Sequence, residues 1–393
     1  MCFVHIYRGF GAGMSTLMQA DNEREHDGIR QTVNRFAAQR APMSSVRKLL
    51  DSDEGYDAEL WRQMTQELGV QALIVPENYG GLGLGFTELA IALEEFGAAL
   101  TPSPLYSTAC ATTALLLAGS DEQRAEWLPL VADGSCTGTV AFAEQRSGWD
   151  LPSVTTTFRE SSEGYTLSGA KCYVVDGATA DFLVVVARAT DSTGSAGLGL
   201  FLVRGEDAGL RRSPLRTMDG TRAQAELVLE NVPAERLAAD LDAVETIALI
   251  AARCAVLLCA EMVGGTQRCL DMAVGYAKIR VQFGRVIGGF QAIKHKAADM
   301  LVAAESARAA LHLATSAADS GDEQFPLLAD LAKATCSEAY FRNAAENIQI
   351  HGGIGFTWEH DAHLYFKRAK SSEVMWGDAD YHREQLSRKL ELA

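Results

Sequence analysis

Hydrophobic residues in the first third of the chain recur at intervals of three and four positions. Leu89, Leu93 and Phe96 illustrate this spacing, which places apolar side chains on one face of an α-helix. The pattern holds through residues 27–134 and predicts an N-terminal domain of packed helices.

The middle of the chain changes to short alternating or wholly apolar runs, such as Phe182–Val186 and Leu198–Val203, separated by Gly, Ser and Asp. Runs of this length are typical of strands, so residues 135–240 are predicted to form a β-barrel or sandwich. Helical spacing then returns and predicts a four-helix bundle over residues 241–393. The expected fold class is α+β, mostly α, in the order helical domain, β-domain, helical bundle.

Residues 1–26 lie outside this pattern and are expected to be disordered or a mis-annotated extension, with Met1 and Met14 as the alternative starts. The opening apolar run is too short for a signal peptide and lacks a small-residue cleavage site. A membrane span needs roughly 18 apolar residues. We expect none, because Arg253 and Glu261 interrupt the longest apolar stretch.

Composition narrows the class of protein. The chain has 393 residues, of which 48% are hydrophobic, and a formal net charge of −16. This balance argues against a nucleic-acid or anionic-membrane surface, although Arg280 and Arg285 offer a local cationic patch for phosphates. The eight cysteines are scattered without a zinc-type spacing, so we expect reduced, mostly buried thiols in a cytoplasmic protein and no metal site.

Three segments carry a more specific signal. They read YAKIRVQFGR from Tyr276, NIQIHGGIGFT from Asn347 and PENYGGLG from Pro76. In order and spacing they resemble the acyl-CoA dehydrogenase family, flavoproteins that desaturate acyl-CoA thioesters next to the carbonyl group. The resemblance covers nearly the whole chain from Asp27 onward, and it implies a helix–β–helix architecture that agrees with the pattern above.

The resemblance also implies FAD at a subunit interface, with the flavin ring against one subunit's β-domain and the adenosine-diphosphate tail on its neighbour. The guanidinium of Arg280 suits a pyrophosphate, because it is a rigid fork of donors with a permanent charge. Gly352 and Gly353 would let backbone N–H groups approach the tail closely. The full predicted tail-holding set is Arg280, Gln282, Phe283, Gln291, Gln349, Gly352 and Gly353.

The ring-holding positions depart from the family. Members usually carry a threonine in a T-E-P segment, then G-x-G-S, then W-I-T facing the flavin. Here the corresponding stretches are Ala143–Gln145, Arg146–Asp150 and Tyr173–Val175, so Ala143 and Val175 lack the two hydroxyls and Trp149 replaces a small residue. Unpaired polar groups would weaken binding, so we expect a weak or empty flavin pocket. The alternative is that Tyr173 and backbone amides suffice.

Desaturation also needs a base for the proton α to the carbonyl, while the flavin takes the hydride. The family's two glutamate positions align here with Trp376, in the turn Met375-Trp376-Gly377, and with Cys254. A cysteine in an apolar helix should have a raised pKa, so we expect Cys254 to line the core or pocket. Glu261, two turns further along the helix, and Asp378 are the lesser candidates for a base.

The remaining polar residues near these segments receive ordinary roles. Glu245 lies too far upstream to act as the base. Glu373, Asp380 and His382 are expected to face solvent or cap helices. The three histidines near the glycine turn match no common metal spacing and are expected to be polar loop residues; they are His351, His360 and His363.

The leading hypothesis is a base-lacking supporting subunit of a heteromeric acyl-CoA dehydrogenase, similar in kind to those of actinobacterial sterol side-chain degradation. It implies an acyl-CoA substrate, a homologous catalytic subunit in a heterotetramer, and an electron-transfer flavoprotein as acceptor. The alternatives are a self-sufficient dehydrogenase with an unusual base, a non-redox acyl-CoA-binding or assembly protein, and a flavin-dependent monooxygenase. The acyl group is not specified by the sequence.

Overall fold

The computed structural model describes residues 15–50, 52, 55–145, 149–162, 164–237 and 242–391, and the side chains of these from residue 24 onward. The chain forms two compact units. The first contains Leu49–Gly85 and Pro102–Cys254, and the second contains Met18–Lys48, Phe86–Thr101 and Ala255–Ala393. The predicted N-terminal domain therefore contributes helices to both units, and each unit is described by itself.

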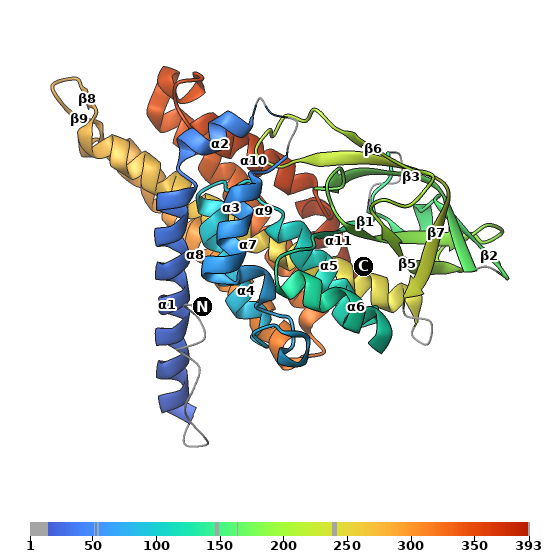
Figure 1. The fold of residues 1–393 in the computed structure, drawn as a ribbon. Helices are drawn as coiled ribbons and strands as arrows, with labels where there is room; N and C mark the ends of the chain where they lie inside the picture. The colour runs from blue at the N-terminus through green and yellow to red at the C-terminus, as the bar shows by residue number, and fades with distance from the viewer. Residues whose placement is uncertain are drawn as a thin grey trace. The chain divides into compact units, whose positions relative to one another are not determined.

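The first unit combines three helices with a barrel of strands (Figure 1). Strand β5 pairs with both β4 and β7, which closes the ring β4, β2, β3, β7, β5. Closure leaves no free edge among these five strands, which protects the sheet from pairing with other chains. Its elements are α3 (Ala58–Gln63), α5 (Leu105–Ala118), α6 (Asp121–Ala132), β1 (Gly138–Ala141), β2 (Thr157–Ser161), β3 (Gly164–Val175), β4 (Phe182–Ala189), β5 (Leu198–Arg204), β6 (Leu210–Pro214) and β7 (Gln224–Leu237).

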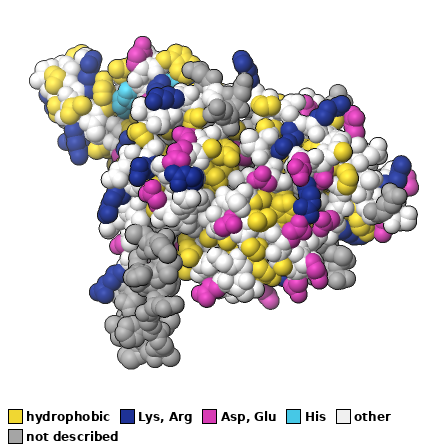
Figure 2. Space-filling model, viewed as in Figure 1, with side chains coloured by type: hydrophobic (Ala, Val, Ile, Leu, Met, Phe, Trp, Pro, Cys, Tyr) yellow, Lys and Arg dark blue, Asp and Glu magenta, His cyan; other side chains and the backbone are white. Residues whose placement is uncertain are grey.

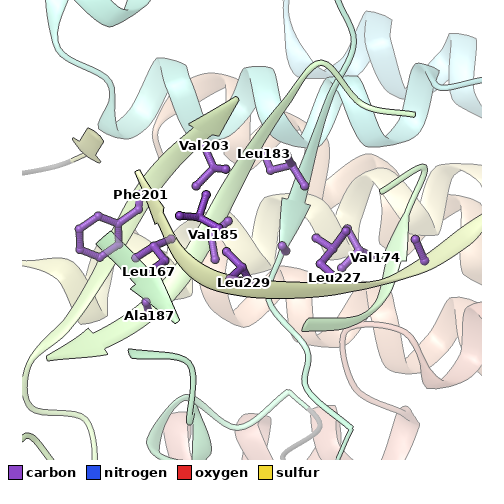
Figure 3. Close-up of a cluster of buried hydrophobic side chains, with 12 residues drawn as sticks. Leu167, Val174, Leu183, Val185, Ala187, Phe201, Val203, Leu227 and Leu229 are labelled. Atoms are coloured by element: carbon purple, nitrogen blue, oxygen red, sulfur yellow. The ribbon is translucent and has the colours of Figure 1, made fainter. Parts of the chain in front are cut away.

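The barrel is filled by side chains at alternate positions, as the strand period requires. Leu183, Val185 and Ala187 project inward from β4 and meet Phe201 and Val203 of β5 (Figure 3). Residues of β3 and β7 complete the cluster, namely Leu167, Val174, Leu227 and Leu229. The runs identified in the sequence as strands therefore form one buried core.

The second unit is a bundle of helices in which α9 packs against α8, α10 and α11 (Figure 1). Buried Glu94 on α4 joins the N-terminal helices to this bundle, because it forms ion pairs with Arg30 of α1, at 2.9 Å, and with Arg308 of α8. The helices are α1 (Ser15–Arg40), α2 (Met43–Leu49), α4 (Phe86–Ala98), α8 (Gln291–Ser320), α9 (Phe325–His351), α10 (Ala362–Val374) and α11 (Ala379–Lys389).

Helix α1 begins at Ser15, inside the stretch that was expected to be disordered. Residues 15–26 contain no glycine or proline and several strong helix formers, but they lack the apolar spacing on which the boundary at Asp27 was based. Local propensity therefore extends the helix beyond its apolar face. Residues 1–14, with the suggested start at Met14, lie outside the described residues.

Helix α7 (Ala243–Ile279) runs from the first unit into the second. Contrary to the expectation from Arg253 and Glu261, one window of this helix is long and apolar enough to span a membrane by length and composition alone. However, 67% of that window is buried inside the protein. A membrane-spanning helix would expose much of its surface to lipid, whereas most of this window packs against the rest of the protein. Helix α7 is therefore described as a core helix.

Candidate functional site

The predicted tail-holding residues begin on a hairpin that projects from the end of α7 (Figure 1). Strands β8 (Val281–Gln282) and β9 (Arg285–Val286) pair across the turn Phe283-Gly284. Both turn residues have positive φ, 53° for Phe283 and 78° for Gly284, as two-residue hairpin turns of the primed type require. Glycine adopts this conformation freely, whereas Phe283 is strained in it.

The hairpin exposes an aromatic ring and a cation together. Phe283 is 92% exposed, and hydrophobic and basic side chains lie side by side on this projection (Figure 2). Arg280 is exposed and forms no ion pair with any residue that the structure describes. Arg285 instead stacks over Phe290, 4.1 Å from the ring centroid, and Gln291 contacts His295 at 3.3 Å. Arg280 is therefore available to a phosphate, while the Arg285 side chain packs on the Phe290 ring.

The second predicted segment closes α9 and continues as a 3-10 turn over Gly352–Phe356. Gln349 is exposed on the last turn of the helix. Gly352 has φ 66° and ψ −145°, a conformation that only glycine adopts readily. A Cβ added to Gly353 would meet no atom within 4 Å, and its φ is not positive. Packing inside this chain therefore does not require a glycine at position 353.

The structure brings the two segments together through a shared apolar base. Ile287 of the hairpin connection and Ile350 of α9 belong to one hydrophobic cluster with Leu270, Ala273 and Met300. Above it, the ring of Tyr276 stacks on His351 with centroids 4.3 Å apart and planes 27° apart. Segments about 70 residues apart in the sequence thus form one surface, as their family spacing implies.

Ala143 and Val175, where the family resemblance implies hydroxyl groups, lie on adjacent segments of the barrel. The backbone N–H of Cys172 donates to the carbonyl of Ala143 at 2.9 Å, and Thr139 Oγ1 donates to the carbonyl of Val175 at 2.6 Å. Between them Tyr173 has φ 59° and is 47% exposed, so its ring remains available for stacking. Trp149 stacks on Phe142, and Arg146, Ser147 and Gly148 lie outside the described residues.

A buried ion pair supports this part of the barrel. Lys171 donates to Glu144 Oε1 at 2.8 Å and to the carbonyl of Phe142 at 3.0 Å. Glu144 also accepts hydrogen bonds from the backbone N–H groups of Thr155 and Thr156. Burial raises the pKa of Glu144, but Lys171 and these donors outweigh burial and bring its pKa to about 2. Burial lowers the pKa of Lys171 to about 8.

The first aligned base position offers no proton acceptor. Cys254 is fully buried in α7, where its carbonyl accepts a hydrogen bond from Tyr106 at 3.1 Å. Burial, together with the neighbouring thiol of Cys110, raises the pKa of Cys254 far above its ordinary value. A thiol in this setting stays protonated, as the sequence predicted.

The second aligned position is a fixed, apolar turn. Trp376 is 7% exposed with φ 61°, and its carbonyl accepts from His382 Nε2 at 2.9 Å. The expectation that His382 caps a helix or faces solvent is wrong, because it is buried between Trp376 and Asp330, 2.7 Å from the carboxylate. Tyr381 and Gly377 complete the tight turn, since a Cβ at Gly377 would lie 2.3 Å from the Tyr381 ring.

Sequence reasoning missed Lys333, which braces the same turn from α9. It is fully buried and donates to the carbonyls of Glu373 and Gly377 and to Ser337 Oγ, at 3.0, 2.8 and 3.0 Å. Burial lowers the pKa of Lys333 to about 8. No motif separates a buried lysine from an exposed one, although its place within an alanine-rich, otherwise apolar turn of α9 was a usable hint.

Both lesser candidates for the base contact other groups in this chain. Glu261 forms an ion pair with buried Arg368 at 3.7 Å. Asp378 caps α11 by accepting from the backbone N–H of Tyr381 at 2.8 Å, which is a structural role. Among the described residues, no group of three or more His, Cys, Asp or Glu side chains is placed to hold a metal ion.

Three family models match the chain in order. They are the acyl-CoA dehydrogenase N-terminal domain at residues 23–135, the middle domain at 139–232 and the C-terminal domain at 249–391. Acyl-CoA dehydrogenase IpdE2 of Mycobacterium tuberculosis is 38% identical over 348 residues, which cover 88% of this chain and 92% of that protein.

Solved structures give the same likeness. A variant of the Tcur3481-Tcur3483 steroid ACAD has a TM-score of 0.86 and 30% identity, covering 94% of this chain and 98% of that chain. The ChsE4-ChsE5 complex of Mycobacterium tuberculosis has a TM-score of 0.84 and 26% identity, covering 94% of this chain and 97% of that chain.

Proposed function

Since the chain belongs to the acyl-CoA dehydrogenase family, we propose that it is the base-lacking subunit of a heteromeric enzyme that desaturates an acyl-CoA thioester with FAD. One observation carries the proposal. Residues suited to a neighbour's flavin tail are exposed on the hairpin and at the end of α9, whereas the two positions aligned with the family's base hold a buried thiol and a buried tryptophan.

The tail-holding residues suit an adenosine diphosphate in charge and space. Arg280 is an exposed cation without an ion pair among the described residues, and the open space at Gly353 serves no packing purpose within this chain. A guanidinium fork and unobstructed backbone N–H groups are the donors that a pyrophosphate needs. Gln282, Phe283, Gln291 and Gln349 would contribute amide and aromatic contacts around it.

Catalysis would then depend on a second, homologous chain. When bound, the flavin accepts the hydride that leaves the β-carbon, and a carboxylate must take the α-proton. This chain would contribute its tail-holding surface, while the partner would provide the base and the ring-holding pocket. The loss of hydroxyls at Ala143 and Val175 supports this division, because a ring seated here would lack those polar partners.

The self-sufficient alternative has less support. It requires Glu261, Asp378 or a water relay as the base, and the two carboxylates are already engaged by Arg368 and by a helix cap. Steroid-derived thioesters are the proposed substrate class, because the structural relatives include one named as a steroid ACAD. ChsE4-ChsE5, a complex of two differently named chains, supports a heteromer, and we infer an electron-transfer flavoprotein as the acceptor.

The test compares the chain alone with the chain co-expressed beside its homologous partner. Alone it should be colourless, and the complex should carry FAD and reduce a dye with acyl-CoA. In the complex, Arg280→Ala should weaken FAD binding about tenfold to a hundredfold, the effect of losing roughly 1.5–3 kcal/mol from a charged hydrogen bond. Arg35→Ala on α1 is the control, since Arg35 is also exposed. A full flavin spectrum from the isolated chain would refute the proposal.

A further inference from the structure

Three aromatic rings form a column behind the glycine turn. Tyr276 stacks on His351 at 4.3 Å, and His351 in turn contacts the ring of His360 at 4.3 Å with planes 49° apart. Tyr276 lies one helical turn before Arg280, and His351 directly precedes Gly352. The column therefore joins the two segments of the tail-holding surface.

The hydrogen bonds of the column determine the state of one ring nitrogen in each histidine. His351 Nδ1 lies 2.8 Å from the carbonyl of Asn347, which can only accept, so this nitrogen carries the proton. His360 Nδ1 accepts from the backbone N–H of Ala362 at 3.1 Å, so it must present a lone pair. An imidazolium has protons on both nitrogens, and protonating His360 would turn that bond into a clash of two donors.

The surroundings add to this restriction. Arg47 of α2 donates to the carbonyls of Trp358 and His360, at 2.7 and 3.0 Å, and is ion-paired with Asp361 at 2.7 Å. Burial lowers the pKa of His351 and of His360, and the neighbouring cation Arg47 lowers that of His360 further, against the opposing carboxylate of Asp361.

A third histidine faces the same loop. Burial, Lys367 and Arg47 lower the pKa of His363. His363 contacts Trp358 edge-on, and Lys367 lies 4.4 Å above the Trp358 ring. Glu359 is exposed on the same loop and accepts from Thr357. The titratable and charged groups near the segment that follows the glycine turn are thus three imidazoles with lowered pKa, two cations and two carboxylates. They are His351, His360, His363, Arg47, Lys367, Asp361 and Glu359.

We propose that the column Tyr276–His351–His360 is a proton-sensitive latch that holds the glycine turn against α7, the helix that precedes the hairpin. When its histidines are neutral, the column holds the two tail-holding segments together. When they are protonated, the turn over residues 352–356 is released from α7. The inference rests on the proposed function, since the ligand concerned is the diphosphate tail of FAD. Because the pKa of each histidine is lower in the folded state, the stabilisation is full above about 6.5 and is lost as the pH falls below that value.

Hydrogen exchange tests the latch without any flavin. In the isolated chain, amides of residues 352–356, corrected for intrinsic rates, should exchange several-fold faster at pH 5.5 than at pH 7.5, while amides of β4 should not. His360→Phe keeps a ring in the column but removes its proton, so the acid response should shrink. His312→Phe, at an exposed histidine of α8, is the control and should leave the response unchanged.

Flavin retention by the complex tests the coupling. FAD should be lost on gel filtration at pH 5.5 more readily than at pH 7.5, and less so in His360→Phe. Equal exchange at both pH values, an equal effect of both substitutions, or pH-independent flavin retention in a complex that needs Arg280 would overturn the latch. If Arg280→Ala leaves the flavin content unchanged, the proposed function fails instead, and the exchange result alone decides whether the latch exists.

Discussion

Two neighbouring glycines have different physical requirements, although both belong to one motif. Gly352 needs to be glycine for its own backbone, since φ is 66° and ψ is −145°. Gly353 has an ordinary φ and open space where a Cβ would lie. On the proposed function, the open space at Gly353 would let the flavin tail approach its backbone.

Substituting each glycine by alanine should separate these roles. Gly352→Ala is expected to destabilise the chain by about 1–3 kcal/mol, the cost of holding a side chain-bearing residue in a backbone conformation that favours glycine, and thereby to lower the urea midpoint. Gly353→Ala should leave the midpoint unchanged within about 0.5 kcal/mol yet reduce FAD retention in the complex. A Gly353→Ala complex that keeps its flavin in full would remove the steric argument for a bound tail.

The sequence determines the chemistry of Cys254 and Trp376 but not their surroundings. That neither is a base follows from side-chain chemistry alone. Their surroundings do not follow from it. Lys333 contacts the carbonyls of Glu373 and Gly377, 40 or more positions away, and His382 is buried against Trp376, contrary to the expectation for this histidine. Tertiary contacts of this kind leave no periodic signal in a single chain.

At the scale of elements, periodicity located the helices and strands, and it left open how they combine. Alternating runs predicted a barrel or a sandwich, and only the double pairing of β5 decides for the barrel. The helical N-terminal region was read as one domain, yet α4 joins the C-terminal bundle because its buried Glu94 is neutralised there. Such choices depend on complementary charges between distant helices, which spacing along one helix cannot reveal.

The barrel loop beside Ala143 gives a prediction at this scale. Glu144 ties Lys171 to the backbone of Thr155 and Thr156, so Glu144→Gln leaves a buried ammonium without its counter-charge. We expect a loss of about 3–5 kcal/mol in the free energy of unfolding, measured by urea denaturation at pH 7. Glu160→Gln on β2, where the carboxylate is exposed, should cost less than about 0.5 kcal/mol.

Acid titration checks the same contact independently. The pKa of Glu144 falls from 4.5 to about 2 on folding, so its contribution is complete above 4.5 and disappears as the pH falls toward 2. The wild-type chain should lose this stability over that interval, and Glu144→Gln should lack that part of the decline. Identical acid profiles for the two proteins would mean that the pair is not formed in solution.

At the scale of the whole molecule, the proposal is an argument about asymmetry between two chains of one fold. On the proposed function, each flavin would take a ring pocket from one subunit and a tail-holding surface from the next. This chain would supply the second and lacks hydroxyls in the first, so a pair of identical copies would set two poor pockets opposite two good surfaces. A pair with an unlike partner would hold flavin on one side only.

Flavin stoichiometry therefore measures the asymmetry directly. The complex should contain about one FAD per two unlike chains, measured as the ratio of flavin absorbance to protein concentration. Restoring both hydroxyls with Ala143→Thr and Val175→Thr should raise that ratio, because a ring seated in this chain would regain about 0.5–1.5 kcal/mol from each hydrogen bond. Ala143→Ser with Val175→Ala is the control for altered packing, since both positions are buried and it restores only one hydroxyl. A wild-type complex with one flavin per chain would show that the methyl groups at Ala143 and Val175 do not impair the pocket, and the division of labour between unlike subunits would then lose its physical basis.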